Sequence, residues 1–160
     1  MRLLLVGHSI VARLASDNSL LQVCRAPPGL VLQYRGIPGA CVSRFFREGL
    51  QVPLPYIIFM RIGENEVGRE DPSQIVSHII NLCRMYSGMG IEYILVYVEQ
   101  YNRTVRIINS ELSRIDEVLP GVHFARAIGF HRRYLHVDGV HSSVQGRRCF
   151  FFTECVNIHL

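Results

Sequence analysis

The chain has 160 residues, of which 49% are hydrophobic and 19% are charged, and its formal net charge is +4. A chain this apolar is not disordered, and no apolar run approaches the roughly 20 residues that a membrane-spanning helix needs. The length is that of one domain, so we expect a single domain over residues 1–160 with no membrane span. Its start has one charge and a very short apolar stretch, which predicts a first strand rather than a signal peptide.

Five short apolar runs predict five β-strands. They are residues 2–6, 30–34, 56–62, 91–98 and 122–126. An unbroken apolar run is typical of a strand that is buried on both faces of a parallel sheet.

Helical patterns alternate with these strands. They cover residues 10–16 and 40–49, a segment from Asp71 to Gly88, residues 105–119, and a final segment from Ser142 or Ser143 to Ile158. Asp71 followed by Pro72 is typical of a helix start, and Gly88 of a helix end. Strands that alternate with helices predict an α/β fold, a three-layer α/β/α sandwich around a five-stranded parallel sheet. Ligands of such sheets bind at the carboxyl ends of the strands, near the point where the strand order reverses.

The five cysteines are odd in number and widely spaced, and none forms a C-x-x-C pair. This pattern predicts reduced thiols and argues against a disulfide framework or a zinc finger. We therefore expect an intracellular, cytoplasmic protein.

All 17 basic residues are arginines. Arginine is the better ligand for phosphates and carboxylates, so one hypothesis is an anionic partner such as a nucleic acid. The alternative is ordinary surface charge, because the arginines are scattered and only Arg132–Arg133 and Arg147–Arg148 are adjacent pairs. The sequence is compatible with both interpretations and predicts no particular oligomeric state.

Four loops that follow predicted strands carry side chains suited to acyl transfer. They are Gly7-His8-Ser9, Gly36-Ile37-Pro38-Gly39-Ala40, Gly63-Glu64-Asn65-Glu66 and the segment from His136 to His141. A serine hydroxyl becomes a nucleophile when a base takes its proton, and His141 can do this for Ser9 near neutral pH. Asp138 lies three residues before His141, a spacing that lets its carboxylate hold the other ring nitrogen. The Ser9 N–H, the Gly39 N–H and the Asn65 amide can stabilise the oxyanion.

This ordered set resembles the SGNH (GDSL-type) hydrolases, a family of serine esterases and lipases with a flavodoxin-like sheet. The Gly-Asp-Ser block of the family corresponds to Gly7-His8-Ser9, its second-block glycine to Gly39, its Gly-x-Asn-(Asp/Glu) block to Gly63–Glu66, and its Asp-x-x-His block to Asp138 and His141. The resemblance covers nearly the whole chain. It implies an SGNH hydrolase fold and an esterase acting on small, acetyl-type esters, which needs neither a metal nor a cofactor.

The chain departs from the family pattern at His8, where the family has an aspartate. A histidine there can compete with His141 for Ser9. The compact chain also resembles esterase-like domains encoded in some eukaryotic retrotransposons. A second hypothesis is therefore a weak or inactive scaffold that binds nucleic acid or protein as part of a mobile-element protein.

Two other kinds of site fit the sequence less well. The cluster of His131, His136, Asp138 and His141 suggests a metal site, but its spacings match no common zinc pattern. Glu64 and Glu66 are too close along one loop to face each other across a sugar, as a glycosidase requires. We expect Glu66 to brace its loop instead.

Overall fold

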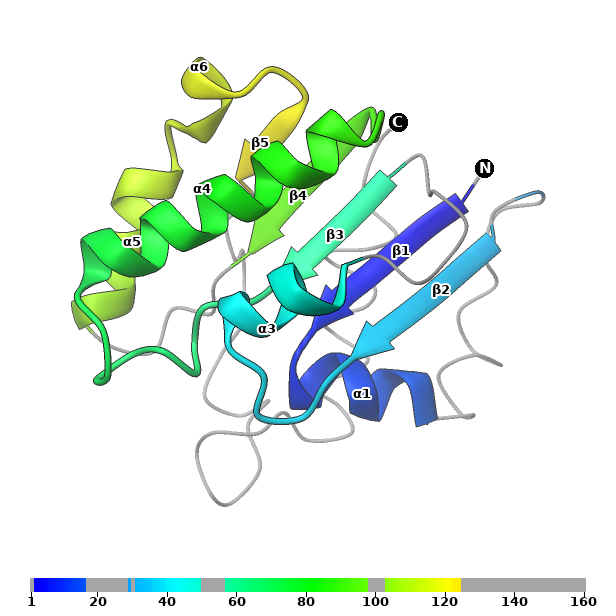
Figure 1. Cartoon of the computed structure of the whole chain (residues 1–160), viewed down its shortest axis with the longest axis horizontal. Helices are drawn as coiled ribbons and strands as arrows, with labels where there is room; N and C mark the ends of the chain where they lie inside the picture. Colours follow the sequence, from blue (N-terminus) through cyan, green and yellow to red (C-terminus); the bar gives the residue numbers. More distant parts are fainter. Residues whose placement is uncertain (1, 17–28, 30, 50–56, 98–102, 125–160) are drawn as a thin grey trace.

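The computed structural model describes residues 2–16, 29, 31–49, 57–97 and 103–124. Its strands are β1 (Arg2–Gly7), β2 (Val31–Gly36), β3 (Ile57–Arg61), β4 (Tyr93–Tyr97) and β5 (Val122–Phe124). They form one five-stranded sheet in the order β2-β1-β3-β4-β5, and every pairing is parallel (Figure 1). The predicted α/β class with a five-stranded parallel sheet is confirmed. The order is flavodoxin-like and reverses between β1 and β3.

Helices cover the sheet from both sides. They are α1 (Ser9–Ser16), α3 (Val42–Glu48), α4 (Pro72–Gly88), α5 (Arg103–Leu112) and α6 (Ile115–Val118). The chain runs from β1 to one edge and then back across the sheet, so right-handed crossovers place α1 on the face opposite α3, α4 and α5. Figure 1 shows α3 and α4 lying across the face turned to the viewer, with α5 beside α4. None of the described helices is long and apolar enough to cross a membrane.

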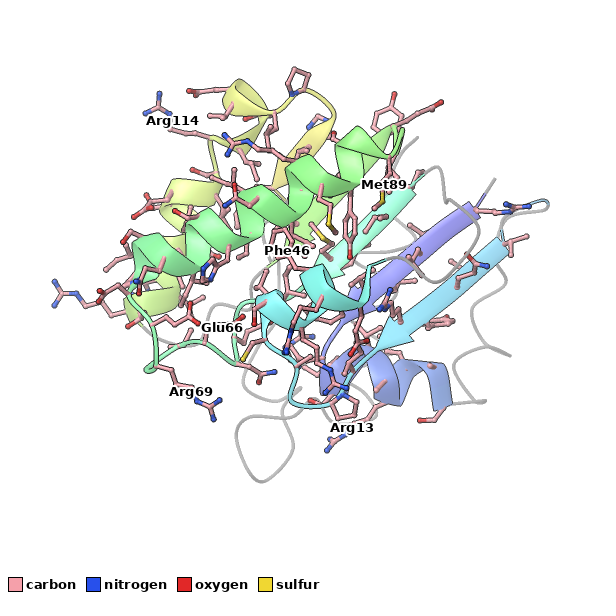
Figure 2. The ribbon with its side chains drawn as sticks, in the orientation of Figure 1. Arg13, Phe46, Glu66, Arg69, Met89 and Arg114 are labelled. Carbon is pink, nitrogen blue, oxygen red and sulfur yellow. The ribbon has the colours of Figure 1, made fainter. Side chains whose placement is uncertain are left out.

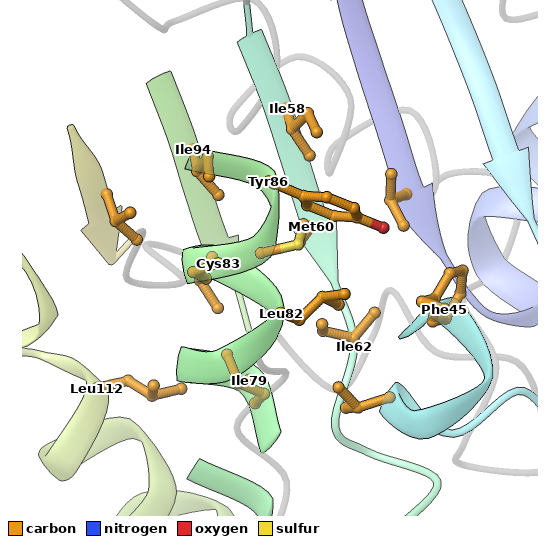
Figure 3. Packing of buried hydrophobic residues seen from close by; sticks show 14 of the residues in the cluster. Phe45, Ile58, Met60, Ile62, Ile79, Leu82, Cys83, Tyr86, Ile94 and Leu112 are labelled. Atoms are coloured by element: carbon orange, nitrogen blue, oxygen red, sulfur yellow. The ribbon is translucent and has the colours of Figure 1, made fainter. Parts of the chain in front are cut away.

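The core lies between the sheet and the helices α3, α4 and α5. Alternate residues of β1, β3 and β4 form two levels in register, Leu4–Ile58–Ile94 and Val6–Met60–Val96, and all six are buried. Phe45 of α3 and Leu82 and Tyr86 of α4 lie over them (Figure 3). The intervening residues of β1 and β3, such as Leu5 and Phe59, are buried as well. The strands are therefore apolar on both faces, which explains their unbroken apolar runs.

Helix α4 begins and ends where the sequence predicts. Asp71 is the N-cap residue, and its backbone N–H donates to the Gln74 side chain over 3.1 Å in a capping box. Pro72 is the first helical residue, where its missing N–H costs nothing. The helix ends at Gly88.

The prediction of one helix over residues 105–119 is wrong, because the segment contains two helices. Helix α5 ends at Leu112 and α6 begins at Ile115. Between them, the Ser113 hydroxyl donates to the Ser110 carbonyl oxygen over 2.7 Å. A serine side chain that bonds to the preceding turn competes with the backbone, and this favours a break in the helix.

The strand ends also differ from prediction. Strand β2 reaches Gly36, two residues beyond its predicted end, because Arg35 and Gly36 pair with Val6 and Gly7 of β1. Strand β3 ends at Arg61, one residue before the end of the predicted run 56–62, and β4 begins at Tyr93, two residues after the start of the predicted run 91–98. The predicted final helix lies outside the described residues.

Gly36 is a position where a side chain does not fit. A Cβ atom there would overlap the backbone of Ala12, because α1 crosses the end of β2 in direct contact. We predict that Gly36→Ala lowers the free energy of unfolding by about 1–3 kcal/mol, as overpacking does elsewhere. Thermal denaturation would show a melting temperature lower by roughly 2–4 °C per kcal/mol.

Gly88→Ala is the matched control. A Cβ atom at Gly88 meets no other atom within 4 Å, and the residue is the last of α4. Alanine favours helix over glycine by up to about 1 kcal/mol, so the control is neutral or stabilising. Equal melting temperatures for the two variants would contradict the close approach of α1 to β2.

Candidate active site

Three of the predicted site residues follow neighbouring strands. Gly7, at the end of β1, pairs with Gly36 of β2 on one side and with Arg61 of β3 on the other. The loops that carry Ser9, Gly39 and Asn65 begin directly after these strand ends. They therefore leave the sheet at the same edge, where the strand order reverses and where such folds bind ligands.

Ser9 is the first residue of α1. The carbonyl oxygen of His8 accepts the first hydrogen bond of this helix, from the Ala12 N–H over 3.1 Å. The first N–H groups of a helix have no partner within it, so the Ser9 N–H is a donor at the positive end of the helix dipole. The residue is half-buried.

Gly39 lies in an exposed turn that precedes α3. The Ala40 N–H donates to the Ile37 carbonyl oxygen over 3.1 Å, and Gly39 has a φ of 68°. A side chain at Gly39 would meet no atom within 4 Å. Glycine is favoured here by the left-handed backbone conformation rather than by space.

Asn65 and Glu66 join this turn to the loop after β3. The Asn65 Nδ2 atom donates to the Ala40 carbonyl oxygen over 2.8 Å. The Glu66 Oε1 atom accepts a hydrogen bond from the N–H of Val42, the first residue of α3. Figure 2 shows Glu66 beside this helix. The expectation that Glu66 braces its loop is confirmed. An amide group has two N–H bonds, so Asn65 keeps one beyond its bond to Ala40.

Burial raises the pKa of the Glu66 carboxyl group, and the negative charges of Glu70 and Glu64 act in the same direction. The hydrogen bond from Val42 opposes the shift without reversing it. The side chain is nearly inaccessible, at 1% exposure. Glu66 therefore serves the site as a structural acceptor.

Beside Ser9 lies a buried row of polar side chains, called the polar chain, which consists of His8, Glu64 and Arg61. The His8 Nδ1 atom is 3.4 Å from the Ser9 Oγ atom, and the His8 Nε2 atom is 2.8 Å from a carboxylate oxygen of Glu64. The other carboxylate oxygen of Glu64 accepts the Arg61 Nε–H over 3.3 Å. His8 is 6% exposed and Arg61 only 1%. The sequence marks His8 as a departure from the family pattern but does not reveal its carboxylate partner, which lies 56 positions away.

The pKa of Glu64 reflects two opposed effects. Burial favours the neutral acid and raises this pKa, whereas the hydrogen bond from His8 and the positive charges of His8 and Arg61 lower it. The second effect is larger, and the pKa of Glu64 lies below its usual range. Glu64 is therefore an ionised carboxylate at neutral pH.

The other predicted site residues lie outside the described residues. These are Asp138 and His141, together with His131 and His136 of the alternative metal cluster. Their positions relative to Ser9 remain predictions. The residues that the structure does describe contain no group of three His, Cys, Asp or Glu side chains that could hold a metal ion.

Comparisons with known proteins give a match in structure alone. No family model and no curated protein matches the sequence. A catalytic variant of Axe2, an acetylxylan esterase from Geobacillus stearothermophilus, is 18% identical with a TM-score of 0.73, over 94% of this chain and 92% of that one. TesA is 18% identical with a TM-score of 0.73, over 92% of each chain. AlinE4, an SGNH-hydrolase family esterase, is 14% identical with a TM-score of 0.65, over 94% and 90%. The chain therefore has the fold of the SGNH hydrolases.

The hydrogen bond from Val42 to Glu66 leads to a stability prediction. Glu66→Ala leaves the Val42 N–H without its acceptor. An unsatisfied buried donor costs about 1–3 kcal/mol, which a lower melting temperature would reveal. Glu66→Gln keeps an acceptor oxygen and removes the buried charge, so we predict a melting temperature at neutral pH at or above that of the wild type.

The pH dependence of this difference has a definite sign. The pKa of Glu66 is raised on folding, so the folded chain holds that proton more tightly than the unfolded chain. This contribution to wild-type stability is lost as the pH rises through the folded pKa. The advantage of Glu66→Gln over the wild type should grow between about pH 4 and pH 7. An advantage that shrinks over this range would contradict the burial of an unfavourable charge.

Proposed function

We propose that the protein is a serine esterase that hydrolyses small, acetyl-type carboxylic esters. The observation that carries this proposal is the position of Ser9 as first residue of α1, at the edge of the sheet where the Gly39 and Asn65 loops are bonded together. The chain also shares its fold with an acetylxylan esterase and an SGNH-hydrolase family esterase. A small ester is therefore the substrate to test first.

In the proposed reaction, the Ser9 Oγ atom attacks the ester carbonyl carbon and His141 takes the hydroxyl proton. Asp138 holds the second ring nitrogen of His141. The alcohol leaves with the proton from His141, and the acyl group stays on Ser9. Water, activated by the same histidine, then attacks the acyl group and frees Ser9. These residues carry every step without a metal or a cofactor.

The oxyanion donors of this mechanism come from three loops. They are the Ser9 N–H, the Gly39 N–H and the second N–H of the Asn65 amide. Asn65 bonds to Ala40 and Glu66 bonds to Val42, so the second and third loops are fixed to each other before substrate binds. Donors that are oriented in advance stabilise the developing negative charge without rearranging during the reaction.

The alternative of a nucleic-acid or protein binding module has weaker support. Arg13, Arg69 and Arg114 project outward from separate parts of the molecule (Figure 2). Arg44 and Arg114 are bonded to glutamates of their own helical segments. The comparisons with known structures give no support to this function, and the link to retrotransposons stays a prediction.

Replacement of the nucleophile gives the first test of the esterase. Ser9→Ala should abolish hydrolysis of p-nitrophenyl acetate above the uncatalysed rate, because the variant has no hydroxyl to acylate. Ser16→Ala is the matched control, since Ser16 is exposed at the other end of the same helix. Equal rates for the wild type and Ser9→Ala would remove the proposal.

Loss of an oxyanion donor gives the second test. Asn65→Ala should lower kcat for p-nitrophenyl acetate by roughly 10²–10³-fold, the usual cost of one such donor. Asn81→Ala, at an exposed position of α4, is the control. Circular dichroism would separate this effect from misfolding, since Asn65 also binds Ala40. An unchanged kcat in a folded Asn65→Ala variant would exclude Asn65 from the oxyanion hole.

A further inference from the structure

The polar chain beside Ser9 has the order of groups that activates a serine. A hydroxyl, an imidazole and a carboxylate follow one another, with 3.4 Å between Ser9 Oγ and His8 Nδ1 and 2.8 Å between His8 Nε2 and Glu64. We propose that His8 is a second base for Ser9 and that Glu64 is its positioning residue. This inference rests on the proposed esterase function, and it assigns a role to the residue at which the chain departs from the family.

The hydrogen bond to Glu64 decides which ring nitrogen of His8 can act. The Glu64 carboxylate also accepts the Nε–H of the Arg61 guanidinium, a permanent positive charge that favours the ionised carboxylate, and an ionised carboxylate only accepts hydrogen bonds. The proton of a neutral His8 ring therefore lies on Nε2, which leaves the Nδ1 lone pair facing Ser9. This is the tautomer that can accept the hydroxyl proton. The contact of 3.4 Å is long, as catalytic hydrogen bonds often are before substrate binds.

Arg61 fixes the carboxylate on the other side. It is the last residue of β3, is almost wholly buried, and donates to Glu64 over 3.3 Å. His8 follows Gly7, which pairs with Arg61 across the sheet. The pairing of these two central strands therefore sets the positions of His8 and Arg61 on either side of Glu64. Buried charges are costly unless they are paired, so this arrangement differs from a chance contact of surface residues.

The proposed step balances as an ordinary acyl transfer. The Ser9 Oγ–H proton moves to His8 Nδ1 while a bond forms between Oγ and the carbonyl carbon, whose π electron pair moves to the carbonyl oxygen. When the tetrahedral intermediate collapses, the bond to the alkoxy oxygen breaks and the leaving alcohol takes the proton from His8 Nδ1. Glu64 keeps its charge throughout and stabilises the transient imidazolium.

In this proposal, either His8 or His141 accepts the Ser9 hydroxyl proton in a given reaction. The consequence is redundancy, which a single base does not give. With His141 as the only base, its removal leaves the Ser9 hydroxyl without an acceptor. With His8 as a second base, the His141→Ala variant keeps a Ser9-dependent reaction that His8→Ala then removes.

The test measures labelling of Ser9 by a fluorophosphonate and hydrolysis of p-nitrophenyl acetate in the full chain. We expect His141→Ala to label more slowly than the wild type but faster than Ser9→Ala. Adding His8→Ala to His141→Ala should slow labelling at least about 10²-fold further, the lower range for a general base. His123→Ala in the same background is the control, since His123 is exposed on β5 at the far edge of the sheet.

Glu64→Gln separates positioning from folding. Glutamine keeps the size of the side chain and an acceptor for His8 Nε2–H but removes the negative charge. In the His141→Ala background it should slow labelling, and it should have no effect once His8 is also alanine. A residue that only supports the fold would act equally in both backgrounds, and thermal denaturation confirms that each variant is folded.

The two hypotheses fail in different ways. If wild type and Ser9→Ala label and hydrolyse equally, the proposed esterase is wrong. If the wild type labels at Ser9 but folded His141→Ala labels no faster than Ser9→Ala, the second base is wrong and the esterase stands. The second base is also overturned if neither His8→Ala nor Glu64→Gln slows labelling of a folded His141→Ala variant.

Discussion

The candidate site depends on the parallel pairing of β1 with two strands at once. Backbone hydrogen bonds hold Gly7 level with Gly36 of β2 and with Arg61 of β3, and beyond the strands the Ile37 N–H still donates to the Gly7 carbonyl oxygen over 2.9 Å. Three loops that are distant in sequence therefore start from one line across the sheet. The close packing of the apolar levels beneath them holds this register, because a slip by one residue would move every side chain to the other face, against packing partners of a different shape.

In the described part of the chain, buried polar residues are concentrated at that edge of the sheet. Among the described residues, the buried polar or charged residues are His8, Arg61 and Glu66, and all three follow or end the central strands. Each removes a charge or a strong hydrogen-bonding group from water, which destabilises the fold unless partners compensate. The Glu64 carboxylate supplies hydrogen-bond partners for His8 and Arg61, while the Val42 N–H of α3 supplies one for Glu66. Such an arrangement is typical of sites that need fixed charges.

Local patterns allowed the elements to be predicted, and non-local contacts account for what was missed. The apolar run 2–6 and the Asp71–Pro72 start define β1 and α4 through burial and capping, which the sequence itself encodes. The break after Leu112 coincides with a hydrogen bond from the Ser113 hydroxyl, and helical periodicity does not reveal it. The bond from Asn65 to Ala40 spans 25 positions and the bond from His8 to Glu64 spans 56, so neither appears in the sequence. The places of Asp138 and His141 remain predictions.

Helix α3 has seven residues, fewer than a helix needs to be stable alone in water. It persists through tertiary contacts, among them the buried Phe45 and the bond from Val42 to Glu66. If α3 unwinds, the turn with Gly39 loses the support of this helix, whereas the strand pairings of β1 involve none of its residues. Proteins open in such partial units at lower free energy than global unfolding. Heating should then loosen the Gly39 turn before the sheet melts, and a chain cooled from that intermediate temperature would regain the turn without refolding its core.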